Sequence, residues 1–211
     1  MPANPSPVAI SRRSALLVVG VFVGSLAAMM ALAPPIWPLA QLGMVLPSAA
    51  LVWGVRGLRP LAGVSRGAIR WPLVVLIAAS SASALLLWAR LAHPDLEAAR
   101  AMIPDQPQPV LLLGALGFAV VNATLEEVAF RGLLQPALGV AWGPRVALVL
   151  QAAAFGVAHL HGVPNGPLGA AMAGVWAVVL GWVRTRTGGL ATPILGHIVA
   201  DLVIFGLLLR P

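Results

Sequence analysis

The amino-acid sequence alternates long apolar runs with short polar connections. Seven runs can be distinguished, at residues 14–33, 38–55, 72–92, 110–138, 144–161, 168–183 and 190–209. A helix needs roughly 20 consecutive apolar residues to span a bilayer, and most of these runs approach or exceed that length. The second run is the weakest, because it is short and contains Pro47. The pattern predicts an all-α fold, a polytopic membrane bundle of about seven transmembrane helices.

The composition favours a membrane protein over a soluble one. Only 9% of the residues are charged and 60% are hydrophobic, whereas about a quarter of the residues of a soluble protein carry a charge. The formal net charge is +7, and every basic residue is an arginine. No aromatic and basic patch accompanies these arginines, so we expect no nucleic-acid partner. The chain has no Cys, which excludes disulfides and thiolate catalysis.

The distribution of the arginines predicts how the helices cross the membrane. With the N-terminus in the cytoplasm, one set of arginines falls on the cytoplasmic side: Arg12, Arg13, Arg56, Arg59, Arg66, Arg70, Arg184 and Arg186, with Arg145 near it. The other side receives Arg90, Arg100, Arg210 and the acidic segment 93–109. This division follows the positive-inside rule. We therefore expect an integral membrane protein whose N-terminus is cytoplasmic.

The first run has two alternative interpretations. Ala31-Leu32-Ala33 resembles a signal-peptidase site, although Pro34 would follow the cut. Ser11-Arg12-Arg13 resembles a twin-arginine signal. We favour a retained first helix, because its positive end would face the cytoplasm and further apolar runs follow it.

The fourth run carries two carboxylates and an arginine at a depth where charges are costly. An ionisable residue within a membrane span indicates a functional site by default. Glu127 and Arg131 are four residues apart, so they share a helix face and can form an ion pair. Glu126 lies about 100° around the helix from Glu127 and can point elsewhere. One carboxylate would then be neutralised by the arginine, and the other would remain for chemistry.

Three further polar side chains lie in the fifth and seventh runs: His159, His197 and Asp201. Buried charges need partners, so we expect them to converge with the two glutamates on one interior site. Glu126 could act as a general base on a water, with His159 holding that water. His197 could donate to a developing oxyanion. Gln151 is expected to form a bond between helices, and the small residues Ala170, Gly174, Ala173 and Ala177 predict close helix packing.

Three short motifs resemble those of a known family. Glu126 to Arg131 matches Glu-Glu-x-x-x-Arg, Phe155 to His159 matches Phe-x-x-x-His, and His197 to Asp201 matches His-x-x-x-Asn/Asp. In this order they resemble the motifs of the CPBP (Abi) intramembrane proteases, which include the type II CAAX-prenyl endopeptidases. The resemblance covers the C-terminal half. It divides the single membrane domain into N-terminal spans with a polar loop (1–109) and CPBP-like catalytic helices (110–211).

The resemblance implies an intramembrane endopeptidase of a bacterial plasma membrane. Glu126 and His159 would activate the water, while His197 and Asp201 would stabilise the oxyanion. Glu127 and Arg131 would support the site, and Phe155 is most simply a packing residue. The partners would be the lipid bilayer and a peptide or protein substrate. Substrates would be membrane-associated peptides or C-terminal tails, since bacterial members are linked to peptide maturation, immunity against bacteriocins and removal of sorting tails.

The role of Asp201 and the presence of a metal remain open at this point. The eukaryotic CAAX enzymes have Asn where this chain has Asp201, and an ionised Asp cannot donate a hydrogen bond. Asp201 is therefore protonated, or it orients His197, or it binds a metal. Glu126, His159, His197 and Asp201 could form a Zn²⁺ site, but no His-Glu-x-x-His motif supports it, and we favour a mechanism without a cofactor.

Two other functions fit the same residues. A non-catalytic membrane protein could protect against a toxin or act as a scaffold, and would keep its function without Glu126. A proton-coupled transporter could use Glu, His and Asp side chains as a proton relay, but it would favour a two-fold repeat of spans, which the sequence does not show.

Overall fold

The computed structural model describes residues 10–32 and 39–209. Within these ranges the chain is helical and contains no strand. The elements are α1 (Arg12–Leu32), α2 (Leu39–Gly54), η1 (Arg56–Leu61), α3 (Trp71–Ala92), α4 (Glu97–Arg100), α5 (Gln108–Glu126), η2 (Glu127–Leu134), α6 (Gln135–Trp142), α7 (Pro144–Ala158), α8 (Gly166–Thr187) and α9 (Ala191–Leu208). The cleavage site considered after Ala33 and the side chain of Arg210 lie outside the described residues.

The helices agree with the seven apolar runs of the sequence. In the described part of the chain, five helices are long and apolar enough to cross a membrane: Arg12–Ala31, Trp71–Ala92, Gln108–Trp142, Gly166–Thr187 and Ala191–Leu208. The apolar helices Leu42–Gly54 and Pro144–Ala158 are shorter. The second run is a helix that continues through Pro47. The fold is therefore the predicted all-α membrane bundle of about seven spans.

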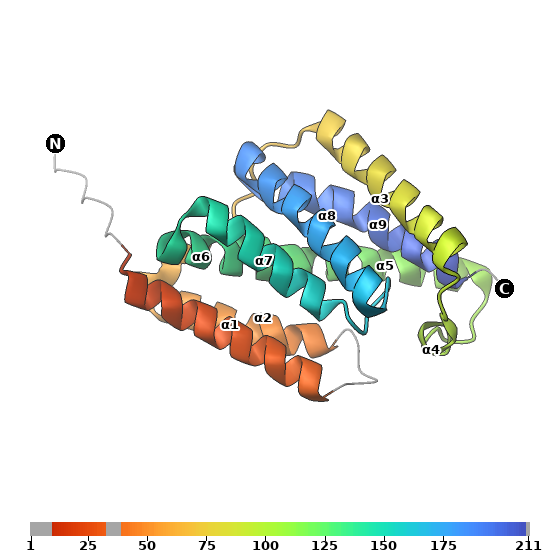
Figure 1. Ribbon diagram of the computed structural model, residues 1–211, viewed down its shortest axis with the longest axis horizontal. Helices are drawn as coiled ribbons and strands as arrows, with labels where there is room; N and C mark the ends of the chain where they lie inside the picture. Colours follow the sequence, from red (N-terminus) through yellow and green to blue (C-terminus); the bar gives the residue numbers. More distant parts are fainter. Residues whose placement is uncertain (1–9, 33–38, 210–211) are drawn as a thin grey trace.

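The helices form a bundle in which the C-terminal elements lie at the centre. Figure 1 shows α1 and α2 along one edge and α3 along the opposite edge, with the elements from α5 to α9 between them. Helix α7 packs against α8, α9 packs against both α3 and α5, and α1 packs against α6. The fourth, fifth and seventh runs, which carry the candidate residues, are therefore gathered in the interior.

The fourth run is one continuous helical stretch with a change of hydrogen bonding in its middle. Residues Glu127–Leu134 are π-helical, and the N–H of Gln135 donates to the carbonyl of Phe130, five residues earlier. A π-helical turn inside an α-helix is rare and occurs frequently at functional sites. Here it begins at the second residue of the Glu-Glu pair, so it coincides with the polar part of the run.

An aromatic series fixes this π-helical segment between its neighbours. Phe130 contacts Phe22 of α1 edge to face, with ring centroids 5.2 Å apart. On its other side it contacts Phe155 of α7 in the same manner, at 4.9 Å. Such contacts add to the burial of the rings. The interior is apolar on both sides of the segment, which isolates its charged residues from water.

The two ends of the bundle differ in their connections. We call one of them the basic end; it holds the segment 56–70 and the turn between α8 and α9. There the segment packs on the turn, and the Leu190 N–H donates to Ser65 O at 2.9 Å. Gly67 has φ +65°, and a Cβ there would lie 2.5 Å from the Gly189 nitrogen. At the other end, the α4 end, lie α4, the connection 159–165 and the C-terminal ends of α3 and α9 (Figure 1).

The close packing of α7 and α8 uses small residues as the sequence predicted. A Cβ on Gly156 of α7 would lie 2.6 Å from the carbonyl oxygen of Ala170 and 3.3 Å from the Cα of Gly174 on α8. The prediction that Gln151 bonds between helices is also confirmed, because its side-chain N–H donates to Ala177 O of α8 at 3.0 Å. This packing holds the end of α7, and with it His159, against the centre of the bundle.

Candidate active site

The two adjacent glutamates are both buried in the bundle interior. Glu126 is the last residue of α5 and is 3% exposed, while Glu127 opens the π-helical segment and is fully buried. The desolvation of an ion is costly unless partners compensate it. Their partners come from the same helical stretch and from α9, which packs against α5.

Glu127 is the centre of a buried chain of charged contacts. Its Oε1 accepts a hydrogen bond from Arg131 Nη1 at 3.0 Å. The same oxygen lies 2.9 Å from Nδ1 of His197 on α9. Since a carboxylate oxygen accepts, the Nδ1 of His197 carries the proton of this bond. The ion pair expected between Glu127 and Arg131 is thus present, and it also orients a histidine that lies 70 residues further along the chain.

The other ring nitrogen of His197 faces two more carboxylates. Its Nε2 lies 3.5 Å from Glu126 Oε2 and 3.7 Å from Asp201 Oδ1. Both distances exceed those of a direct hydrogen bond, so the contacts are electrostatic attractions across a short gap. The imidazole of His197 therefore lies between the two glutamates. Glu127 faces its Nδ1, and Glu126 faces its Nε2.

Asp201 has a partner that the sequence interpretation did not identify. Asn122 of α5 is buried, and its Nδ2 donates to Asp201 Oδ2 at 3.0 Å. The one available signal was an isolated amide in an apolar run, one helical turn before Glu126. Its partner is 79 residues away, so spacing along the chain could not reveal the contact.

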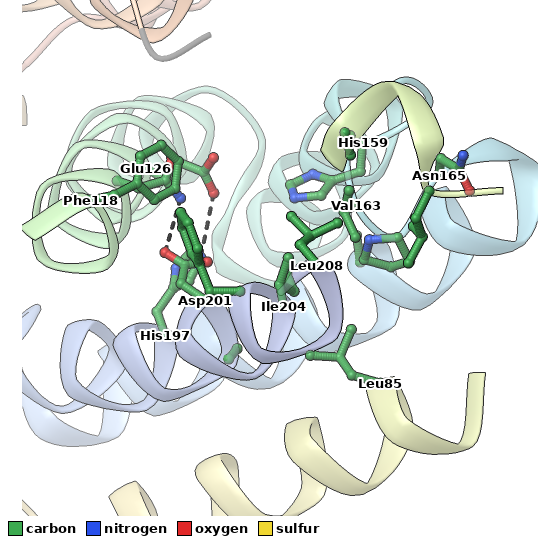
Figure 2. Close-up of a pocket in the computed structure, with 18 of the residues that line it drawn as sticks. Leu85, Phe118, Glu126, His159, Val163, Asn165, His197, Asp201, Ile204 and Leu208 are labelled. Atoms are coloured by element: carbon green, nitrogen blue, oxygen red, sulfur yellow. Dashed lines mark hydrogen bonds and ion pairs between the residues drawn. The ribbon is translucent and has the colours of Figure 1, made fainter. Parts of the chain in front are cut away.

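His159 reaches the same region from the end of α7. It is the residue that follows the helix, and its Nδ1 lies 2.9 Å from the carbonyl oxygen of Phe155. Because a carbonyl only accepts, Nδ1 is the protonated nitrogen, and in a neutral ring Nε2 is then an acceptor. Figure 2 shows His159 on one side of a cavity, with Glu126, His197 and Asp201 on the other side.

Phe155 connects the members of this site through its ring. The His159 imidazole stacks on it with centroids 4.4 Å apart, and the Arg131 guanidinium lies 4.5 Å from its centroid. Trp176 of α8, which the sequence interpretation also missed, contacts His197 edge to face at 4.7 Å. These aromatic contacts restrict both imidazole rings, so Phe155 does more than fill space.

The charged residues lie at the inner end of a large cavity. The cavity has a volume of about 1420 Å³, and Glu126, His159, His197 and Asp201 all line it. Most of its remaining wall is apolar and includes Phe118, Ile204 and Leu208 (Figure 2). A cavity of this kind suits a ligand with a long apolar part and a polar group that reaches the carboxylates.

The geometry gives no support to the zinc alternative. Across residues 10–32 and 39–209, no group of three His, Cys, Asp or Glu side chains is arranged so that it could hold a metal ion. His197 already directs one nitrogen to Glu127, and His159 directs one to a backbone carbonyl. The mechanism without a cofactor, which the sequence analysis favoured, stays a prediction.

Comparison with known proteins finds a similarity in the region of the chain that contains the site. Neither a curated protein nor a solved structure shows significant similarity to the sequence. Residues 108–203 match one family, described as type II CAAX prenyl endopeptidase Rce1-like. The matched region runs from the start of α5 into α9 and contains Glu126, His159, His197 and Asp201. The chain is therefore an integral membrane protein, and the region that carries the candidate site is similar to the Rce1-like, CPBP/CAAX-type intramembrane endopeptidases.

Proposed function

We propose that this protein hydrolyses peptide bonds of membrane-associated peptides or C-terminal tails, using a water activated by Glu126. The observation that carries the proposal is the division of labour between the adjacent glutamates. Glu127 forms the ion pair with Arg131, while Glu126 lines the cavity beside His197. A carboxylate on the wall of an apolar cavity is suited to act as a general base.

In the first step, Glu126 takes a proton from a water held between it and His159. The hydroxide attacks the carbonyl carbon of the substrate, and the carbonyl oxygen becomes an oxyanion. His159 accepts a hydrogen bond from the water through Nε2, because its Nδ1 proton is bonded to Phe155 O. Its stacking on Phe155 keeps the ring in this orientation.

His197 stabilises the oxyanion. When both ring nitrogens carry a proton, Nδ1–H donates to Glu127 and Nε2–H donates to the oxyanion. The proton held by Glu126 then passes to the leaving nitrogen, and the bond between carbon and nitrogen breaks. The products are a carboxylic acid and an amine, between which a proton passes to give a carboxylate and an ammonium group, and Glu126 returns to its starting charge.

Asp201 acts through His197 in this mechanism. An ionised Asp201 cannot donate to an oxyanion, but it lies 3.7 Å from His197 Nε2 and favours the protonated ring. Its bond from Asn122 fixes its position. We therefore propose that Asp201 orients and polarises His197 rather than touching the reacting atoms.

We also propose that the protein lies in a bacterial plasma membrane with its N-terminus in the cytoplasm. The basic end carries the start of α1 and the segment 56–70 (Figure 1). Positively charged connections are retained on the cytoplasmic side of a membrane. This orientation makes the α4 end the non-cytoplasmic one.

Cleavage assays test the proposal directly. The wild type, Glu126→Gln and the matched control Glu97→Gln are purified in detergent and assayed with a library of membrane-tethered C-terminal peptides. Glu97 is exposed on α4 and does not line the cavity, so its variant reports on the substitution itself. We expect cleavage by the wild type and the control, and none by Glu126→Gln.

A second arm of the assay separates the alternatives. Cleavage that persists with a chelator supports a glutamate-dependent hydrolysis, whereas loss on chelation would indicate a metal enzyme. Undiminished cleavage by Glu126→Gln would refute the assigned base. If the wild type cleaves nothing in the library, the non-catalytic immunity or scaffold function becomes the better explanation.

A further inference from the structure

The cavity that holds the site is placed asymmetrically in the bundle. Around the site itself its wall includes Asn122, Glu126 and His197. The rest of the wall comes from the end of α1, the middle of α3, the first half of α5, the first two thirds of α8, the last half of α9, the segment 95–106 and the connection 158–165. The end of α1, the first half of α5, the last half of α9, the segment 95–106 and the connection 158–165 all lie towards the α4 end (Figure 1). The cavity therefore runs from Glu126 towards the α4 end of the molecule.

The interior between Glu126 and the basic end is occupied by packed side chains. Leu58 and Leu61 of η1 are buried there against Leu133 of η2 and Ala137 of α6. Ala15 and Val18 of α1 belong to the same cluster. A well-packed apolar cluster has no room for a polypeptide. Among the described residues, the open approach to Glu126 is therefore from the α4 end or from the lipid beside it.

The two ends carry opposite charge among the described residues. The basic end has a set of arginines without any carboxylate: Arg12, Arg13, Arg56, Arg59, Arg66, Arg70, Arg145, Arg184 and Arg186. The α4 end has three carboxylates, Asp95, Glu97 and Asp105, and two arginines, Arg90 and Arg100. The positive-inside rule assigns the first end to the cytoplasm and the second to the opposite side.

We propose that the cavity opens on the non-cytoplasmic face, and that its substrate is an apolar, membrane-tethered segment of an exported polypeptide. The nature of the substrate rests on the proposed peptidase function. The side on which the cavity opens rests on the packing and the charge of the two ends of the bundle. The apolar wall near the mouth, with Met102, Ile103 and Leu111, accepts the apolar part of the segment. The scissile bond then lies deeper, beside Glu126 and His197.

The absence of Cys makes the accessible side directly measurable. Three single-Cys variants are expressed in cells: Met102→Cys at the mouth, Ile204→Cys on the cavity wall, and Val55→Cys at the basic end. Met102 and Val55 are similarly exposed, at 58% and 48%, so they form a matched pair. Whole spheroplasts are treated with a thiol reagent that cannot cross the membrane, before and after permeabilisation.

We expect Met102→Cys and Ile204→Cys to react in intact spheroplasts, and Val55→Cys to react only after permeabilisation. The reverse pattern would overturn the inference, whatever the outcome of the cleavage assay. Reaction of Met102→Cys from outside without reaction of Ile204→Cys would also overturn it, because the cavity would then not open to that side.

A vesicle assay separates this inference from the proposed function. A membrane-tethered peptide that the detergent-solubilised protein cleaves is presented on the outer surface of right-side-out or inside-out vesicles. Cleavage only in right-side-out vesicles supports the inference. Cleavage only in inside-out vesicles would leave the peptidase function intact but refute the proposed side. Absence of cleavage even in detergent would count against the function, and the labelling experiment would still decide the side.

Discussion

The side-chain amide of Asn122 donates to Asp201 Oδ2 at 3.0 Å, and both residues are buried in the interior of the bundle. The contact joins α5 to α9 at one helical turn from Glu126 and from His197. It therefore links the helix that carries the proposed base to the helix that carries the proposed oxyanion donor.

The first prediction concerns this contact. Asn122→Leu removes the amide donor, so the buried carboxylate of Asp201 loses this hydrogen bond. The loss costs about 1–3 kcal/mol of unfolding free energy. We expect a lower midpoint of thermal unfolding in detergent and a fall in kcat that exceeds any change in KM. The exchanged double variant, Asn122→Asp with Asp201→Asn, restores an amide opposite a carboxylate and should recover more activity than Asn122→Asp alone. Equal activity of those two variants would show that the contact has no positioning role.

The second prediction contrasts the adjacent glutamates. Glu127→Gln leaves the fully buried Arg131 without its counter-charge, and breaking a buried ion pair costs about 3–5 kcal/mol. Glu126→Gln leaves that pair intact, so we expect it to unfold close to the wild-type temperature while losing cleavage. Thermal unfolding of both variants beside Glu97→Gln measures the difference. Similar destabilisation by Glu126→Gln and Glu127→Gln would contradict the division of roles.

The third prediction concerns His159. His159→Gln removes the nitrogen that is proposed to hold the water, and acid–base groups of this kind contribute at least about 10²-fold to the rate. We expect kcat on a cleavable peptide to fall by about that factor with little change in KM. His93→Gln, at an exposed residue outside the cavity lining, is the control and should behave as wild type. A kcat of His159→Gln within twofold of the control would remove His159 from the mechanism.

The fourth prediction tests the packing of α7 on α8. In Gly156→Ala the new methyl group would lie 2.6 Å from a backbone oxygen of α8, so the helices must separate, at a cost of about 1–3 kcal/mol. Gly117→Ala on α5 is the matched substitution, because a Cβ there meets nothing within 4 Å. We expect a lower unfolding temperature for Gly156→Ala. Gly117→Ala should not lower it, because alanine stabilises an exposed helix relative to glycine by up to about 1 kcal/mol. Equal unfolding temperatures would refute the close approach.

Hydropathy predicted the spans because burial in lipid depends on length and polarity, which are local properties. The run 144–161 shows the limit of this reasoning, since α7 ends at Ala158 and places His159 just beyond the helix. Likewise, the run 110–138 gave no sign of the π-helical segment within it. The hydrogen-bond register of a helix is not encoded in hydropathy, and here the segment's polar side chains have partners on other helices.

The candidate site was predictable only in part. The spacing of Glu127 and Arg131 indicated their pairing, because both lie on one helix. The bridging position of His197 between the two glutamates, and the contacts of Asn122 and Trp176, depend on how α5, α8 and α9 pack. The roles assigned to Glu126, His159, His197 and Asp201 stay predictions until the variants are assayed.

The π-helical segment Glu127–Leu134 sets a limit on engineering this protein for stability. Deleting one residue from it would allow a regular α-helix, which is the lower-energy backbone and would leave the helix content measured by circular dichroism almost unchanged. The deletion would also rotate everything on one side of it by about 100° relative to the other side, separating Glu126 from the groups that Arg131 and Gln135 contact on α8. A search for thermostable variants that scored only folding would therefore favour a helix in which the site no longer exists.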